Sequence, residues 1–263
     1  MNEEQSEKTA NTRIARVVGV ASGKGGVGKS TIAVLLAQAL KAKGSRVGIL
    51  DADITGPSVP RLLGVDSFRA EADDGKLVPI RSDEGIEVMS INFLIDEETR
   101  PVIWRGPLLS QAVKQFWTDT AWGELDWLVV DLPPGTSDVM LTALQSLPFD
   151  GLLFAATPQD FVSMIVAKAV HMADQTKTRA LGLVVNMESL VCPHCGKEIP
   201  LFSGESSEAP DLGMPILARI PWRADLAQKR HLLWDSLSEE IRTTSLNLAE
   251  GVEATLVRSE ARR

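Results

Sequence analysis

The sequence of 263 residues contains only two cysteines, Cys192 and Cys195. Two thiols this close together cannot build the disulfide framework that holds many small secreted domains together. In a reducing compartment, a pair at this spacing indicates metal or redox chemistry instead.

Long hydrophobic runs and an excess of basic residues are also missing. No apolar run approaches the roughly 20 residues that span a bilayer, and the polar N-terminus has no hydrophobic signal region. The formal net charge of −8 argues against a protein whose main work is coating nucleic acid. We therefore expect a cytoplasmic protein with no membrane partner and no nucleic-acid partner.

The remaining totals are those of an ordinary globular protein, with 44% hydrophobic and 24% charged residues. A chain of this length can bury a substantial core in a single α/β domain. The sequence contains no internal repeat and no low-complexity linker. We expect a disordered polar tail over residues 1–13 and one domain over residues 14–263.

Apolar segments typical of strands alternate with helical segments along the chain. This alternation predicts a single α/β domain with a doubly wound, mostly parallel sheet and helices on both faces. Short peripheral strands are expected over 77–80 and 86–89, and a loop with both cysteines over 191–213. The buried strands are expected over residues 17–21, 47–50, 126–131, 151–156, 181–186 and 216–220. Helices are expected after the first strand, over residues 60–63, 104–117, 138–146 and 160–176, and after the last strand.

Residues 23–31 fit the pattern G-x-x-x-x-G-K-[ST] of a phosphate-binding loop, here called the phosphate loop. The segment lies between an expected strand and an expected helix, which is the context that the motif requires. Glycines let backbone N–H groups surround phosphates, Lys29 can reach the outer phosphates, and Ser30 can ligate Mg²⁺. The alternative is a glycine-rich turn without a ligand. The predicted nucleotide contacts in this loop are Gly23, Lys24, Gly25, Gly26, Val27, Gly28, Lys29, Ser30 and Thr31.

Three aspartates, Asp51, Asp53 and Asp131, lie where expected apolar strands end. Ligands of such sheets sit at the carboxyl ends of the strands, so we expect these acids to converge on the phosphates. Asp131 matches the Walker B pattern, and we predict a magnesium site from Ser30, Asp51 and Asp131. Asp53 can orient the attacking water, while Asp51 can act in the second shell of Mg²⁺. Each of these two can instead form a turn, and the sequence does not separate their roles.

Lys24 follows the first glycine of the phosphate loop, at a position where a simple loop demands nothing in particular. The string from Lys24 to Thr31 resembles the deviant Walker A loop of the MinD/ParA/nitrogenase-iron-protein class. In that class the extra lysine crosses a dimer interface to the partner's nucleotide. The resemblance implies a homodimer with a nucleotide between the chains. With Lys24 added, the predicted catalytic residues are Lys24, Lys29 and Asp53. The alternative is a solvated surface lysine.

The cysteine pair of Cys192-Pro193-His194-Cys195-Gly196 leaves several interpretations open. Proline and glycine shape a tight turn that directs both thiolates toward one metal site. A tetrahedral zinc ion or a four-iron cluster usually needs four ligands, which two chains of a dimer supply across a two-fold axis. Spacing does not separate zinc from a cluster. Redox catalysis, as in thioredoxin-like enzymes, and inert surface thiols are the remaining alternatives.

Taken together, these motifs resemble the Mrp/ApbC-type P-loop iron–sulfur cluster carriers over about residues 17–221. The resemblance implies a homodimeric ATPase that holds a [4Fe-4S] cluster between two cysteine pairs and passes it to apo-proteins. It also implies ATP as the nucleotide and Asn186 as an adenine contact. The residues that carry the resemblance are 24–31, 51–58, 104–107, 131–136, 185–187 and 192–196.

Other functions fit parts of the sequence. The main alternative is a MinD/ParA-like regulatory or positioning ATPase with a structural zinc at Cys192 and Cys195. A C-terminal basic amphipathic helix of the MinD membrane-binding type is not indicated, because residues 246–263 have few large apolar side chains. A nitrogenase-like reductase places its cluster cysteines far apart in sequence, which this chain cannot do. The phosphate loop alone also permits a phosphotransferase.

Overall fold

The computed structural model describes residues 13–53, 56, 58–94, 106–161, 164–192, 194–201 and 213–260. The tail expected over residues 1–13 lies outside this part of the chain, except for Arg13, which begins the first strand.

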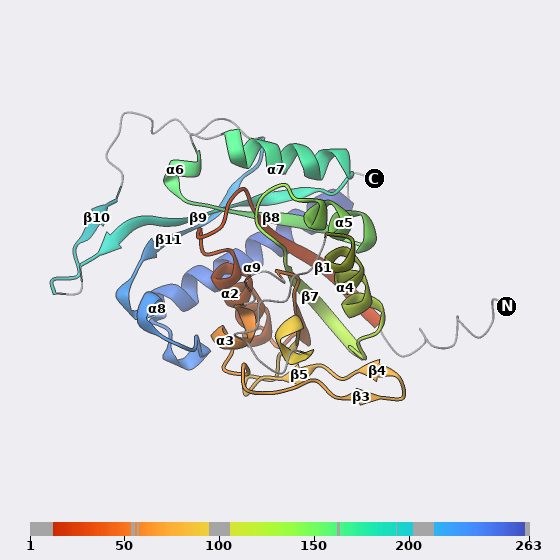
Figure 1. Cartoon of the computed structure of the whole chain (residues 1–263). Helices are drawn as coiled ribbons and strands as arrows, with labels where there is room; N and C mark the ends of the chain where they lie inside the picture. Colours follow the sequence, from red (N-terminus) through yellow and green to blue (C-terminus); the bar gives the residue numbers. More distant parts are fainter. Residues whose placement is uncertain are drawn as a thin grey trace.

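The described residues form one α/β domain, as Figure 1 shows. The strands are β1 (Arg13–Ser22), β2 (Val47–Asp51), β3 (Ala72–Asp73), β4 (Lys76–Leu77), β5 (Ile80–Arg81), β6 (Glu87–Ser90), β7 (Glu124–Asp131), β8 (Gly151–Ala156), β9 (Ala180–Val191), β10 (Glu198–Pro200) and β11 (Ile216–Trp222). The helices are α2 (Lys29–Ala42), α3 (Val59–Leu62), α4 (Gly106–Thr118), α5 (Asp138–Ser146), α6 (Pro158–Phe161), α7 (Met164–Gln175), α8 (Ala224–Gln228) and α9 (Glu239–Glu260), with short 3₁₀ turns η1 (Ile91–Leu94) and η2 (Trp234–Ser236).

The main sheet has nine strands within the described residues, in the order β10-β9-β8-β1-β7-β2-β6-β5, with β11 also paired to β9. Every pairing between β2, β6, β7, β1, β8, β9 and β11 is parallel, and only β5 and β10 run antiparallel to their neighbours. Strand β1 lies in the interior of the sheet, and its last six residues are buried. The phosphate loop that follows β1 is therefore held near the middle of the sheet.

Helices cover both faces of the sheet (Figure 1). Helix α2 packs against α9, and the two helices cover one face. Helices α4, α5 and α7 lie on the other face, where α7 packs across β1, β8 and β9. The apolar strands are covered on both sides because βαβ crossovers are right-handed. Such crossovers place helices on one face while the strand order runs in one direction, and on the other face after the order reverses. The prediction of a doubly wound, mostly parallel sheet is confirmed.

The sequence-based prediction of a loop over 191–213 is wrong in its first part. Strand β9 continues past the core to Val191 and pairs antiparallel with β10. The chain reverses between them, where Gly196 has φ +69° and its N–H donates to the Cys192 carbonyl at 2.9 Å. This two-stranded projection, residues 188–201, is here called the cysteine arm (Figure 1). Sequence reasoning missed it because its described residues, apart from Ser189, are half-buried or exposed, so its strands lack the continuous apolar pattern of the core strands.

Two other predicted elements are divided in the structure. The strand expected over 77–80 is two short strands, because β4 pairs with β3 whereas β5 pairs with β6. Pro79 lies between them, and proline has no N–H for a strand ladder. The helix expected over 160–176 is observed as α6 and α7, and the helix expected from 104 is described from Gly106 onward.

Candidate nucleotide site and cysteine pair

The phosphate loop runs from the end of β1 to the first turn of α2. Gly26 and Gly28 have φ values of +81° and +83°, in the left-handed region that favours glycine. A Cβ placed on Gly28 would also lie only 2.2 Å from Asn186 Nδ2. Gly28 is therefore required for both its backbone conformation and the space beside it.

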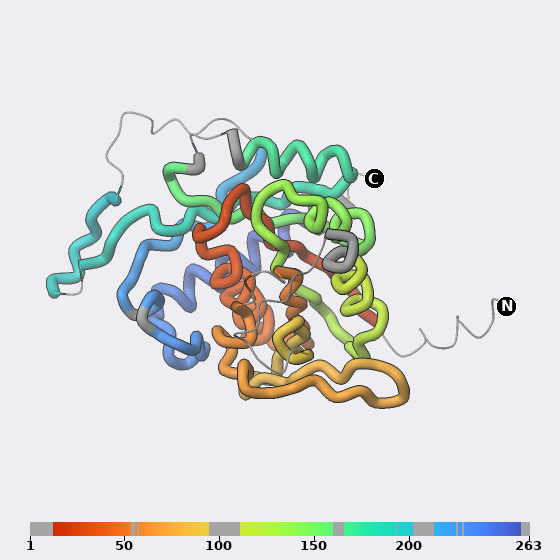
Figure 2. The backbone as a smooth tube through the Cα atoms, viewed as in Figure 1, coloured from red at the N-terminus to blue at the C-terminus, as the bar shows by residue number. Residues whose placement is uncertain are grey.

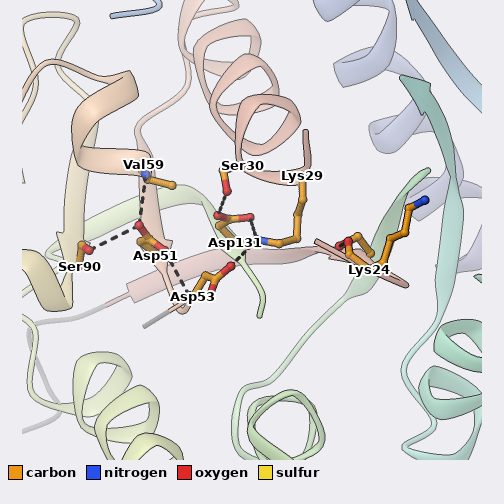
Figure 3. Close-up of polar contacts among 9 residues, drawn as sticks. Lys24, Lys29, Ser30, Asp51, Asp53, Val59, Ser90 and Asp131 are labelled. Atoms are coloured by element: carbon orange, nitrogen blue, oxygen red, sulfur yellow. Dashed lines mark hydrogen bonds and ion pairs between the residues drawn. The ribbon is translucent and has the colours of Figure 1, made fainter. Parts of the chain in front are cut away.

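The predicted lysine and carboxylates come together beside the phosphate loop (Figure 3). Lys29 Nζ lies 2.6 Å from Asp131 Oδ1 and 3.6 Å from Asp53 Oδ2. The Ser30 hydroxyl donates to Asp131 Oδ2 at 2.5 Å. Asp51 and Asp131 are register partners at the ends of β2 and β7, which places their carboxyl groups at the same edge of the sheet.

Asp51 is fully buried and holds the loop between β2 and α3. Its Oδ1 accepts the Asp53 N–H at 3.2 Å, and its Oδ2 accepts the Val59 N–H at 3.2 Å. Ser90, at the end of β6, donates its hydroxyl to Oδ2 at 3.5 Å (Figure 3). Asp51 thus positions the backbone of Asp53 directly. A role for Asp51 in the second shell of Mg²⁺ stays a prediction.

Burial controls the ionisation of these acids. Burial raises the pKa of Asp51 well above its ordinary value, and the neighbouring Asp131 carboxylate raises it further, against the opposing effect of Lys29. Burial also raises the pKa of Asp131, although Lys29 and the Ser30 hydroxyl counteract it. Three carboxylates against one lysine leave an excess of negative charge in a buried site. This set of hard oxygen donors fits a divalent cation such as Mg²⁺.

Lys24 lies on the opposite side of the loop from Lys29. Its side chain is exposed and points away from the carboxylates (Figure 3). The Ser22 hydroxyl donates to the Lys24 carbonyl at 2.9 Å, and the Gly135 N–H donates to the Ser22 carbonyl at 2.9 Å. The start of the phosphate loop is therefore tied to the segment that follows Asp131.

Asn186 lies on β9 and is buried against the phosphate loop. Its Nδ2 donates to the Val27 carbonyl at 2.8 Å. Sequence reasoning singled out Asn186 from the family resemblance but did not foresee this bond, which joins residues far apart in the chain. Its predicted contact with adenine stays a prediction.

The two cysteines lie at the tip of the cysteine arm. Cys192 is half-buried and Cys195 is exposed, and both thiols are free. Hydrogen bonds from the backbone N–H groups of Cys195 and His194, followed by one from the Cys195 side chain, lower the pKa of the Cys192 thiol. The described part of the chain contains no cluster of three or more His, Cys, Asp or Glu side chains that can hold a metal ion. Within the residues that the structure describes, the pair therefore offers two candidate metal ligands.

Relatives of known description are similar to this chain over most of its length. An iron–sulfur cluster carrier protein of Clostridium perfringens is 47% identical over 224 residues, which cover 82% of this chain and 78% of that protein. A protein of the same description from Methanocaldococcus jannaschii is 41% identical and covers 92% of this chain and 87% of its own length. A cytosolic Fe-S cluster assembly factor Nubp2 homolog of Drosophila grimshawi is 44% identical over 79% of this chain and 84% of its own.

Solved structures of other proteins have a similar fold. A nucleotide-binding protein of Archaeoglobus fulgidus in complex with ADP superposes with a TM-score of 0.69 at 36% identity, over 95% of this chain and 90% of that one. The cell division ATPase MinD of Pyrococcus furiosus has a TM-score of 0.60 at 18% identity, over 91% of this chain and 99% of its own, and shares the fold.

None of the helices in the described ranges is long and apolar enough to cross a membrane. The sequence model of the ParA family, described as NUBPL iron-transfer P-loop NTPase, matches residues 13–252. The resemblance to P-loop iron–sulfur cluster carriers is thereby confirmed, and the chain belongs to the ParA family of iron-transfer P-loop NTPases.

Proposed function

We propose that this protein is an ATP-hydrolysing carrier of iron–sulfur clusters that acts as a homodimer in the cytoplasm. The two cysteine pairs of the dimer hold one [4Fe-4S] cluster and release it to apo-proteins. The observation that carries this proposal is the contrast between the two sites. The phosphate site brings Lys29, Ser30 and Asp131 together within one chain, whereas the cysteine pair offers only two of four thiolates.

The residues of the nucleotide site divide the work of hydrolysis. Backbone N–H groups of the phosphate loop bind the phosphates, and Lys29 turns from Asp131 toward them. Ser30, Asp51 and Asp131 would hold Mg²⁺, and the ion would supply charge neutralisation at the phosphates. Asp53 orients the attacking water. Lys24, which points away from its own carboxylates, reaches the partner's nucleotide, and Asn186 contacts adenine.

The cysteine pair is suited to binding a cluster that is later transferred to another protein. The lowered pKa of Cys192 favours the thiolate, which is the form that binds iron. Cys195 is exposed at the tip of the arm, so thiolates of an acceptor protein can approach the cluster and replace these ligands one by one. A cluster shared across two chains is released when the two arms separate.

Anaerobic reconstitution with iron and sulfide tests this proposal. The dimer is expected to bind about one four-iron cluster, measured by iron and sulfide content and by visible absorbance. Cys192→Ser and Cys195→Ser are each expected to abolish the cluster, while His194→Ala, between the two thiols, retains it. Transfer is then measured as cluster absorbance gained by an apo-ferredoxin. Stoichiometric zinc without any cluster would favour a MinD/ParA-like positioning ATPase, in which the same thiols hold a structural metal.

A further inference from the structure

A segment between α8 and α9 passes beside the short helix α3. Residues 229–237, here called the C-terminal strap, include the 3₁₀ turn η2. Figure 2 shows the strap, in blue, next to α3, in orange. The side chains of Leu232 and Leu237 are buried, 1% and 4% exposed, so the strap is anchored in the core at two points.

The strap binds the C-terminal end of α3. The Leu232 N–H donates to the carbonyl of Leu62, the last residue of α3, at 2.7 Å. His231 Nδ1 lies 3.0 Å from the Arg61 carbonyl oxygen, and because a carbonyl can only accept, Nδ1 is the donor. A helix of four residues cannot satisfy its last carbonyls by itself, and it is marginal without outside contacts. The strap therefore supplies partners that hold this end of α3.

The same strap is bound to α2, the helix that begins in the phosphate loop. The buried Gln38 side chain of α2 donates to the Leu232 carbonyl and also to Glu84 Oε2, the latter at 2.8 Å. Glu84 accepts the Trp234 N–H with its other oxygen. The N–H and the C=O of Leu232 are thus bound to α3 and to α2, respectively, so one residue bridges the two helices.

These two helices carry the two halves of the nucleotide site. Lys29 and Ser30 form the start of α2, whereas α3 follows the segment that contains Asp51 and Asp53. The Asp51 carboxylate spans that segment, since it accepts the N–H of Asp53 with one oxygen and the N–H of Val59 with the other, each at 3.2 Å. Val59 is the first residue of α3. A displacement of α3 therefore reaches Asp51 and, through it, Asp53.

We propose that the C-terminal strap is a positioning element for hydrolysis, in which His231 and Leu232 fix α3 relative to α2. Binding of ADP uses the phosphate loop at the start of α2, whereas hydrolysis also requires Asp53 at the γ-phosphate. Looser contacts of the strap therefore impair hydrolysis and spare ADP binding, because a small misplacement of a catalytic group costs rate. The inference rests on the proposed role of Asp53 in orienting the attacking water.

The test uses the full chain and separates rate from affinity. His231→Ala removes one bond to α3 without opening the core, since His231 is only half-buried. Its kcat for ATP hydrolysis is expected to fall roughly tenfold, while the Kd for ADP, measured by calorimetric titration, changes less than about twofold. Hydrogen–deuterium exchange of residues 59–65 is expected to become faster. His231→Asn is expected to restore both properties, because its amide N–H takes the place of the Nδ1–H.

A second variant loosens the strap from the other side. Gln38→Met removes the bonds to Leu232 and Glu84 with a side chain of similar volume, and it is expected to lower kcat in the same way. His171→Ala is the matched control, because His171 is exposed and contacts Gln175 of its own helix, α7. It is expected to leave kcat and exchange unchanged.

Wild-type kcat in His231→Ala or in Gln38→Met would overturn the inference. A loss of ADP affinity in proportion to the loss of kcat would also overturn it, as would an equal loss of kcat in His171→Ala. Cluster binding is measured in the same preparations. A selective loss of kcat in a chain that binds no cluster would support the strap and count against the cluster carrier, whereas a cluster-loaded chain whose kcat is insensitive to His231→Ala would do the reverse.

Discussion

Lys29 and Asp131 form a buried ion pair in which Nζ lies 2.6 Å from Oδ1. The Lys29 side chain is 6% exposed and that of Asp131 is fully buried. The pair joins the phosphate loop to the end of β7. It therefore contributes both to the stability of the fold and to the nucleotide site. Removal of one partner leaves the other charge buried without its counter-charge.

Lys29→Met is therefore expected to lower the free energy of unfolding by about 3–5 kcal/mol, the usual effect of leaving one partner of a buried pair. Asp131→Asn added to Lys29→Met is expected to restore most of this loss. Urea denaturation measures both. Lys43→Met is the control, because Lys43 pairs with Glu253 at the surface, where a pair contributes at most about 1 kcal/mol. A double variant no more stable than Lys29→Met alone would contradict the prediction.

The buried acids give stability a distinctive dependence on pH. Because the pKa of Asp51 is raised in the folded protein, the folded state binds more protons than the unfolded state above the ordinary carboxyl pKa. The stabilisation that comes from the proton on Asp51 is fully present below the ordinary carboxyl pKa. It is lost as pH rises through the raised pKa of the folded state. Asp51→Asn removes it, so the stability of the variant relative to wild type is expected to increase with pH in that window. Urea denaturation across a pH series without Mg²⁺ measures the difference.

Asp126→Asn supplies a control of opposite sign. Hydrogen bonds from Arg46 lower the pKa of Asp126, so its contribution is present above the ordinary pKa and lost as pH falls. The variant is expected to lose stability relative to wild type as pH rises through the acidic range. The same pH trend in both variants would show that the burial of Asp51 does not determine its ionisation.

Most of the nucleotide site could be predicted from the sequence, because its chemistry lies in short motifs. The phosphate loop is contiguous, and Asp51, Asp53 and Asp131 were expected at one edge because parallel strands end together there. Ser90 was not predicted as a partner of Asp51, since a serine at the end of a short strand has no signal of its own. Contacts between distant segments depend on strand register, which a motif does not encode.

The backbone conformations of the cysteine arm and of Met187 were also not predicted from the sequence. The sequence between Met187 and Leu201 mixes polar and apolar residues without strand alternation, and its described residues apart from Ser189 are half-buried or exposed. Met187 has a left-handed conformation with φ +59°, which methionine itself does not favour. Local preference predicted a loop here, and tertiary contacts produced a strand with a bulge.

Gly28→Ala is expected to reduce nucleotide affinity strongly and to destabilise the protein by about 1–2 kcal/mol, the cost of a side chain in the left-handed region. The new methyl group also displaces the Asn186 amide from Val27. Gly25→Ala is the matched control within the same loop, because a Cβ on Gly25 meets nothing within 4 Å. Calorimetric titration with ADP and thermal denaturation measure both effects. Similar losses in the two variants would show that the conformation of Gly28 has no special role.

Mixed dimers test the action of Lys24 across the interface. Lys24→Ala and Asp53→Ala subunits are each expected to be inactive alone, whereas a heterodimer has one intact site built from both chains. An equal mixture is expected to recover about a quarter of wild-type hydrolysis, since half of the dimers are mixed and each has one working site. Phosphate release measures it. A mixture no more active than either parent would place Lys24 outside the partner's site.

The position of β1 also determines the order in which the molecule assembles during synthesis. Val18 pairs with Val129 of β7 on one side and with Gly151 of β8 on the other. These pairings join residues that are far apart in the sequence. Strand β1 is therefore synthesised well before β7 and β8, with which it pairs. Both cysteines follow β8 in the sequence. The two thiols therefore leave the ribosome only after the strands that flank β1, and a half-made chain exposes neither of them.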